Sequence, residues 1–156
     1  VEFDTSRGGP PGAVRFDSLE DWSRRPEEGI RYYSGTARYR TTFLLPRLPA
    51  EGPASSIVID LGRVEVMARV RLNGRELGVA WSAPHRLDAT GALRPGENVL
   101  EIEVANLWPN RLIGDRAVPP ERRVAWTTWN PYRADSPLLE SGLLGPVTLR
   151  KRVTAP

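Results

Sequence analysis

Hydrophobic and polar residues alternate along much of the chain with a period of two. Within residues 36–45, Ala37, Tyr39 and Phe43 occupy alternate positions, and arginine or threonine fills the positions between them. Residues 66–72 repeat the pattern. Because successive side chains of a β-strand point to opposite faces, this alternation predicts strands with one buried and one solvated face.

Turn residues separate the predicted strands. Asn73-Gly74 is the strongest hairpin signal in the chain, because a type I′ turn needs a positive φ at both central residues. Residues 55–62 form a short apolar run, which predicts a strand buried on both faces. After a turn at Pro95-Gly96, the next strand is marked by three apolar residues, Val99, Ile102 and Val104.

These short strands, without a helix of more than ten residues, predict a single all-β domain over residues 1–156, a β-sandwich. We expect an irregular segment over 1–30 with a short helical turn in 16–22, where Asp17 or Ser18 would be the N-cap. Core strands are expected over 34–105, a long loop segment over 107–141 and a closing strand over 145–153. Loops as long as 107–141 are usually functional or cover something.

Composition narrows the classes of protein to which the chain can belong. It is 40% hydrophobic and 26% charged, which is ordinary for a globular protein with a core. The absence of cysteine excludes disulfides and thiolate metal sites. The formal net charge is +3, but the arginines are scattered through the alternating segments without a basic stripe or recognition helix. We therefore expect no nucleic-acid partner.

No stretch of the sequence is long and apolar enough to span a membrane, and we expect no membrane partner. No signal peptide is visible, and the chain begins at Val1 rather than at methionine. This start indicates an excised domain or a processed product. The expected location, periplasmic or secreted, therefore refers to the parent protein.

Three pieces of sequence together carry a family likeness: YYSGTARY (32–39), VRLNGRELG (70–78) and NLWPNRLIGD (106–115). Over roughly residues 16–150 the chain resembles the sugar-binding β-sandwich of glycoside hydrolases. It is most similar to the C-terminal module of family 106 α-L-rhamnosidases, which is related to the family 2 sugar-binding domain. The resemblance implies a jelly-roll β-sandwich with the galactose-binding-domain-like fold. It also implies a non-catalytic accessory module of a bacterial enzyme whose catalytic domain lies outside this chain.

The same resemblance leaves two roles open. Some modules of this type bind glycan, here including rhamnose-containing glycans, while others complete the active-site rim or only support the catalytic domain. The expected partners are therefore carbohydrate and the catalytic domain of the parent enzyme. A purely structural interaction domain is the alternative to a carbohydrate-binding module.

Carbohydrate binding needs aromatic faces for stacking and planar polar groups that fix hydroxyls. Trp126, Trp129 and Tyr132 lie together in a polar part of the long loop segment, whereas Trp22 is expected to anchor the core. The predicted stacking residues are Trp81, Trp108, Trp126, Trp129 and Tyr132. The predicted polar partners are Asn106, Asn110, Arg111 and Asp115.

The stretch from Asn106 to Asp115 also has a structural interpretation. Asparagine side chains can satisfy backbone groups where a strand passes into a long loop, and Arg111 can pair with Asp115 or a carbonyl. Buried polar groups are costly unless they are paired, which favours such a corner lock. The competing interpretation is that these residues project toward a sugar or the catalytic partner.

No catalytic residue is predicted in this chain. Glycoside hydrolysis needs two carboxyl groups facing each other across a cleft, whereas Glu101 and Glu103 share one strand face. His85 is the only histidine, which excludes a histidine-based metal cluster. The resemblance implies that a structural calcium ion is possible in such modules, with Asp4, Asp17, Asp60 and Glu103 as conceivable oxygen ligands.

Overall fold

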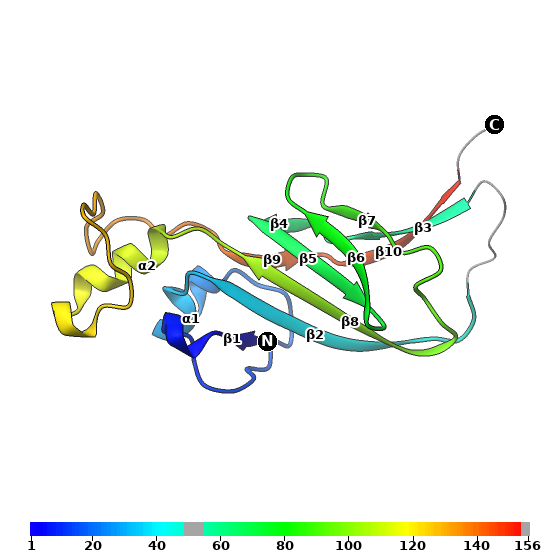
Figure 1. Ribbon diagram of the computed structural model, residues 1–156, viewed down its shortest axis with the longest axis horizontal. Helices are drawn as coiled ribbons and strands as arrows, with labels where there is room; N and C mark the ends of the chain where they lie inside the picture. The colour runs from blue at the N-terminus through cyan, green and yellow to red at the C-terminus, as the bar shows by residue number, and fades with distance from the viewer. Residues whose placement is uncertain (49–54, 154–156) are drawn as a thin grey trace.

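Antiparallel sheets in two facing layers form the body of the protein (Figure 1). The computed structural model describes residues 1–48 and 55–153. One layer is a five-stranded sheet in the order β1 (Glu2–Phe3), β2 (Thr36–Leu45), β8 (Gly96–Ala105), β5 (Met67–Leu72) and β6 (Arg75–Ala80). The other layer contains β10 (Thr148–Val153), β3 (Ser55–Asp60) and β7 (Arg86–Asp88), and the pair β4 (Arg63–Glu65) and β9 (Gly142–Gly145). The predicted all-β sandwich is confirmed.

The core lies between the layers, where the alternation of the sequence places apolar side chains. It includes Ala37 and Tyr39 from β2, Ala68, Val70 and Leu72 from β5, and Ile57 and Ile59 from β3. In β8 the buried residues are Asn98, Leu100, Ile102 and Val104, whereas Val99 is only half-buried. All three residues that marked this strand lie on β8, and Val99 points to the opposite face because it lies an odd number of residues from Ile102.

Charged residues cover the outer face of the five-stranded sheet. Glu103 on β8 lies opposite Arg38 on β2 and Arg69 on β5. Its carboxylate is 3.2 Å from one guanidinium and 3.5 Å from the other. This carboxylate therefore forms cross-strand ion pairs with both neighbouring strands, which stabilise the pairing of β8 with β2 and β5.

The hairpin at Asn73-Gly74 is confirmed, and it also anchors the neighbouring strand. The two residues have φ values of 53° and 80° and join β5 to β6. The Asn73 side chain accepts a hydrogen bond from the Val99 backbone N–H and donates to Asn98 Oδ1. Asn98 is fully buried and uses both amide hydrogens on backbone carbonyls, so this buried polar group is paired.

The N-terminal segment differs from its prediction in three places. β1 joins the sheet through β2, so residues 1–30 are not wholly irregular. The first turn near Trp22 is the 3₁₀ helix η2 (Trp22–Arg24), and its N-cap is Asp21, which accepts the Ser23 N–H, rather than Asp17 or Ser18. A second 3₁₀ turn, η1 (Thr5–Arg7), and the helix α1 (Glu28–Arg31) complete the segment.

Residues 107–141 extend beyond one end of the sheets, and we call them the α2 lobe (Figure 1). The lobe contains α2 (Pro109–Gly114) and the 3₁₀ turns η3 (Asp115–Ala117) and η4 (Pro120–Arg122); the rest is irregular. It then leads into β9, which precedes the closing strand β10. Among the described residues, no helix has the length and apolar character needed to cross a membrane.

Acid should weaken the fold through Asp60, at the end of β3. Arg86 Nε and the Gly62 N–H donate to this carboxylate at 2.8 and 3.0 Å, and these bonds lower the pKa of Asp60. Because the folded-state pKa lies below the unfolded value, the stabilisation is present above the ordinary value of 3.8. It is lost as pH falls through the lowered folded-state pKa.

Urea denaturation of the wild type and the Asp60→Asn variant at pH 7 and pH 3 checks this prediction. The variant should be less stable at pH 7, and the difference between the two proteins should shrink at pH 3. The comparison at pH 7 is the internal control for folding of the variant. An equal difference at both pH values would contradict the assignment.

Candidate functional site

The α2 lobe and its junction with β8 hold eight of the nine predicted carbohydrate contacts. Trp81 is the exception, since it lies on the loop between β6 and β7. The remaining eight lie between residues 106 and 132, on or around α2. They are Asn106, Trp108, Asn110, Arg111, Asp115, Trp126, Trp129 and Tyr132.

The tryptophans among these residues are unusually exposed for large aromatic side chains. Trp126 is 85% exposed, Trp129 74% and Trp108 52%, while Tyr132 is half-buried. Trp81 is also exposed, at 78%. Exposed aromatic side chains on a loop segment provide surface for a ligand or a partner rather than for the core of this domain.

The loop that carries Trp129 is tied to α2 by side-chain amides and guanidinium groups. Asn130 donates to the Leu112 carbonyl at 2.9 Å and accepts the Tyr132 N–H at 2.9 Å. Arg116 Nε donates to the Tyr132 carbonyl at 2.9 Å. These bonds hold residues 130–132 against the helix, so the aromatic side chains extend from a supported loop.

Side-chain hydrogen bonds of Asn106 and Asn110 fix the start and the end of the α2 lobe. Asn106 donates to the Tyr33 carbonyl at 2.8 Å and accepts the Gly35 N–H at 2.9 Å. Asn110 is 1% exposed, donates to the Leu139 carbonyl and Ser141 Oγ, and accepts the Leu139 N–H. These are the hydrogen bonds that the corner-lock interpretation predicts. Both N–H donors of Asn110 are used within the fold.

Arg111 on α2 and Asp115 at the start of η3 are both buried. Asp115 Oδ2 accepts the backbone N–H groups of Val124 and Ala125, at 3.2 and 2.8 Å, which fixes the returning loop beside α2. Arg111 Nε donates to the Tyr32 carbonyl at 2.9 Å. Burial lowers the pKa of the Arg111 guanidinium, an effect that Asp115, 3.7 Å away, opposes.

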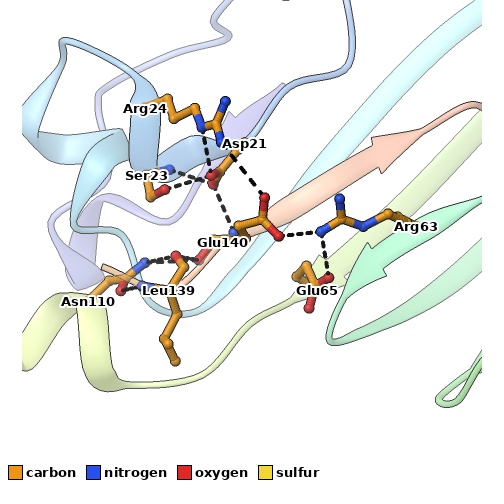
Figure 2. Close-up of polar contacts among 9 residues, drawn as sticks. Asp21, Ser23, Arg24, Arg63, Glu65, Asn110, Leu139 and Glu140 are labelled. Carbon is orange, nitrogen blue, oxygen red and sulfur yellow. Dashed lines mark hydrogen bonds and ion pairs between the residues drawn. The ribbon is translucent and has the colours of Figure 1, made fainter. Parts of the chain in front are cut away.

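One small cavity lies beside Asn110 and is bordered by a chain of ion pairs (Figure 2). Its volume is about 220 Å³, and Glu65, Asn106 and Glu140 contribute to its lining. Arg63 pairs with both glutamates, and the hydrogen bond to Glu140 raises the pKa of the Arg63 guanidinium. Arg63 therefore links the two glutamates in one ion-pair network beside the cavity.

A second cavity, of about 260 Å³, lies at Trp108, and we call it the Trp108 cavity. Trp108 and Arg111 line it from the lobe, together with Val124. The N-terminal segment and the residues just before β2 supply the other lining residues, Asp4, Ser6, Arg7 and Ser34. None of these four was among the predicted contacts. A larger cavity of about 580 Å³ lies elsewhere, and none of the nine predicted contacts lines it.

The four conceivable calcium ligands do not gather. Asp4 lies 3.7 Å from Arg7, Asp17 2.8 Å from Arg15, and Asp60 and Glu103 have the arginine partners described above. Within residues 1–48 and 55–153, no three Asp, Glu, His or Cys side chains come together as a metal-binding group. These four carboxylates therefore do not form a calcium site together, and a structural calcium ion stays a prediction.

Comparison with known proteins places this geometry in a family context. A family model described as the glycosyl hydrolase 2 galactose-binding domain-like domain matches residues 21–134. A putative beta-glucuronidase of Formosa agariphila is 41% identical over 159 aligned residues. That alignment covers 87% of this chain but only 14% of the relative.

Solved structures agree with this comparison. A rhamnosidase from Novosphingobium sp. PP1Y is 43% identical, with a TM-score of 0.87 over 96% of this chain and 14% of that protein. A beta-glucuronidase from Ruminococcus gnavus is 24% identical, with a TM-score of 0.51 over 64% of this chain and 17% of that protein, and it shares the fold alone. The chain thus spans about 14% of the length of its two more similar relatives.

Proposed function

The chain belongs to the galactose-binding-like domain family of the family 2 glycosyl hydrolases, and from this membership we propose that it is a non-catalytic, carbohydrate-binding accessory domain of a bacterial glycoside hydrolase. The observation that carries the proposal is the exposure of three tryptophans on one lobe, Trp108, Trp126 and Trp129. A sugar ring stacks on such aromatic faces, whereas these side chains contribute little to the core of the domain.

The parent enzyme we propose is an α-L-rhamnosidase, and the finer assignment is the C-terminal module of family 106. The similarity to the Novosphingobium rhamnosidase, over nearly the whole chain, supports this choice. The similarity to the putative beta-glucuronidase of Formosa agariphila also favours a glycoside hydrolase parent, although the activity in that relative's name is not that of a rhamnosidase. Rhamnose-containing glycans are therefore the first ligands to test, and the parent would act outside the cytoplasm.

A calorimetric titration of the chain with L-rhamnose and with rhamnose-containing pectic oligosaccharides tests carbohydrate binding. We expect saturable heat with the wild type and at least a roughly tenfold weaker affinity in the Trp126→Ala, Trp129→Ala double variant, since each exposed ring would supply stacking area. Running each titration with and without calcium tests the ion as well.

Trp81→Ala separates the two exposed aromatic sites, because Trp81, itself a predicted stacking residue, has similar exposure but lies on the β6–β7 loop and not on the α2 lobe. This variant should keep the wild-type affinity. Loss of binding in Trp81→Ala alone would place the sugar on the other loop. No heat from the folded wild type with any of these ligands would contradict carbohydrate binding.

A second candidate function is docking on the catalytic domain of the parent enzyme. The α2 lobe also exposes aliphatic side chains beside its tryptophans: Leu107 at 54%, Leu139 at 47% and Val124 at 40%. Contiguous exposed apolar surface marks interfaces. Since the chain spans 14% of its two more similar relatives, a partner within the same polypeptide would be available.

A further inference from the structure

Arg111 keeps most of its hydrogen-bond donors unused although its side chain is only 9% exposed. Nε donates to the Tyr32 carbonyl, and Nη1 lies 3.7 Å from Asp115 Oδ1, which is too long for a hydrogen bond. A guanidinium carries five N–H donors. Four of them therefore make no hydrogen bond with the described residues.

These unused donors reach the Trp108 cavity. Among the described residues, no side-chain nitrogen or oxygen is both fully buried and without a hydrogen-bond partner. The terminal nitrogens of Arg111 must therefore lie at accessible surface, and the cavity that Arg111 lines provides that surface. A buried guanidinium is costly unless water or a ligand fills its donors.

A second guanidinium lies at the same cavity. The Arg7 guanidinium carbon is 5.7 Å from the centroid of the Trp108 ring, and Arg7 Nε is 3.7 Å from Asp4 Oδ2. The side chain of Arg7 makes no hydrogen bond with the described residues. The Ser6 backbone N–H and hydroxyl both donate to Asp4 Oδ1, whereas Asp4 Oδ2 accepts no hydrogen bond from them.

We propose that the Trp108 cavity binds one hexuronate unit of an acidic sugar, with its carboxylate on Arg7 and Arg111 and a ring hydroxyl on Asp4 Oδ2. The proposal rests on the carbohydrate-binding function above and names its ligand class. Arginine donors form strong, charge-assisted hydrogen bonds with carboxylates. An acceptor oxygen that is ion-paired with Arg7 but accepts no hydrogen bond, beside two guanidinium groups, suits a ligand that carries both a carboxylate and hydroxyl donors.

The size of the cavity supports a single sugar unit. Its volume of about 260 Å³ lies just below the range of about 300–1,000 Å³ that is usual for small-molecule pockets. The Trp108 ring provides an apolar wall for the C–H groups of the sugar. A lone carboxylate would leave that wall and the Asp4 acceptor unused, so an acidic sugar accounts for more of the lining than an acidic side chain does.

An NMR titration of the 156-residue chain, following the Trp108 indole N–H resonance, tests the proposal. The probes are sodium D-galacturonate and D-galactose, which differ at one carbon by a carboxylate in place of a hydroxymethyl group. We expect galacturonate to bind saturably and at least about tenfold more tightly than galactose at the same ionic strength, because only its carboxylate can engage the arginines.

Arg7→Gln is the informative variant, because Arg7 is half exposed and should not be needed for folding. It should weaken galacturonate binding severalfold and leave galactose unchanged. Arg15→Gln, at an arginine whose side chain is 89% exposed outside this cavity, is the matched control and should retain wild-type affinity for galacturonate. Arg111 itself is a poor test, since its Nε also supports the fold.

The outcomes separate this inference from the function on which it rests. Equal binding of galacturonate and galactose at Trp108 would overturn the carboxylate assignment and leave carbohydrate binding standing. If acetate binds as tightly as galacturonate, the assignment of a sugar as the ligand is wrong, and any carboxylate suffices. If neither sugar shifts the Trp108 resonance while pectic oligosaccharides still give heat in the calorimetric titration, the Trp108 cavity is not the binding site. If the pectic oligosaccharides give no heat either, the proposed carbohydrate-binding function fails as well.

Discussion

Replacing Trp22 with alanine should lower the free energy of unfolding by about 3–5 kcal/mol. Trp22 is fully buried, with its ring stacked on Tyr39 at 6.3 Å between centroids and edge-on to Phe3 and Tyr33. Its indole N–H donates to the Tyr39 hydroxyl at 2.6 Å. The substitution would leave a large cavity in a domain whose whole stability is on the order of 5–15 kcal/mol.

Urea denaturation followed by circular dichroism measures the effect. Trp126→Ala is the matched control, since the same side chain is 85% exposed there and its loss should change stability by at most about 0.5 kcal/mol. Trp22→Phe keeps an aromatic ring and removes the hydrogen bond to Tyr39, so its loss should be intermediate. Equal midpoints for Trp22→Ala and Trp126→Ala would contradict the role of Trp22 as the core anchor.

The alternation of apolar and polar residues predicted the strands well, because a strand between the core and solvent needs apolar side chains on one face and polar side chains on the other. The prediction for 36–45 matches β2 at both ends, and the Asn73-Gly74 hairpin forms as expected. The prediction that 55–62 is a strand buried on both faces was wrong in its burial, since β3 ends at Asp60 and Val58 is only half-buried between Ile57 and Ile59. A short apolar run lacks the polar positions that would tell which face is solvated.

Local turn chemistry is ambiguous where several residues could cap a helix. Asp17, Ser18 and Asp21 all carry side-chain oxygens that can accept an N–H at a helix start. The structure uses Asp21, because Trp22 must enter the core and its backbone N–H donates to the Ser141 carbonyl at 3.0 Å. That partner lies far along the chain, so no local pattern could select the cap.

The sequence predicted the site residues of the α2 lobe but not those of the N-terminal segment. The tryptophans of the α2 lobe, together with Arg111, stand out as large polar-tipped groups in a segment without periodicity. Arg7 and Asp4, by contrast, look like an ordinary capped turn, with Asp4 as N-cap and Gly8 in the left-handed region. Only tertiary packing brings that turn against Trp108, about a hundred residues later in the sequence.

Asn110→Ala should cost about 2–3 kcal/mol of unfolding free energy, since it removes three hydrogen bonds worth about 1 kcal/mol each. It would free the Leu139 backbone and Ser141 Oγ, which hold the segment leading into β9 (Figure 2). Ser141 in turn donates its N–H to Asp21, so the loss would reach the N-terminal segment. Urea denaturation again gives the measurement.

The Asn110 variant also separates the two interpretations of residues 106–115, because a corner lock and a sugar contact respond differently. A corner lock predicts lower stability with unchanged affinity for any bound sugar, measured well below the unfolding transition. Asn130→Ala is the control, since this half-buried asparagine makes one donor and one acceptor bond to backbone and should cost less. Full stability with lost binding would instead make Asn110 a ligand contact. Since both N–H donors of Asn110 are already used within the fold, we expect the first result.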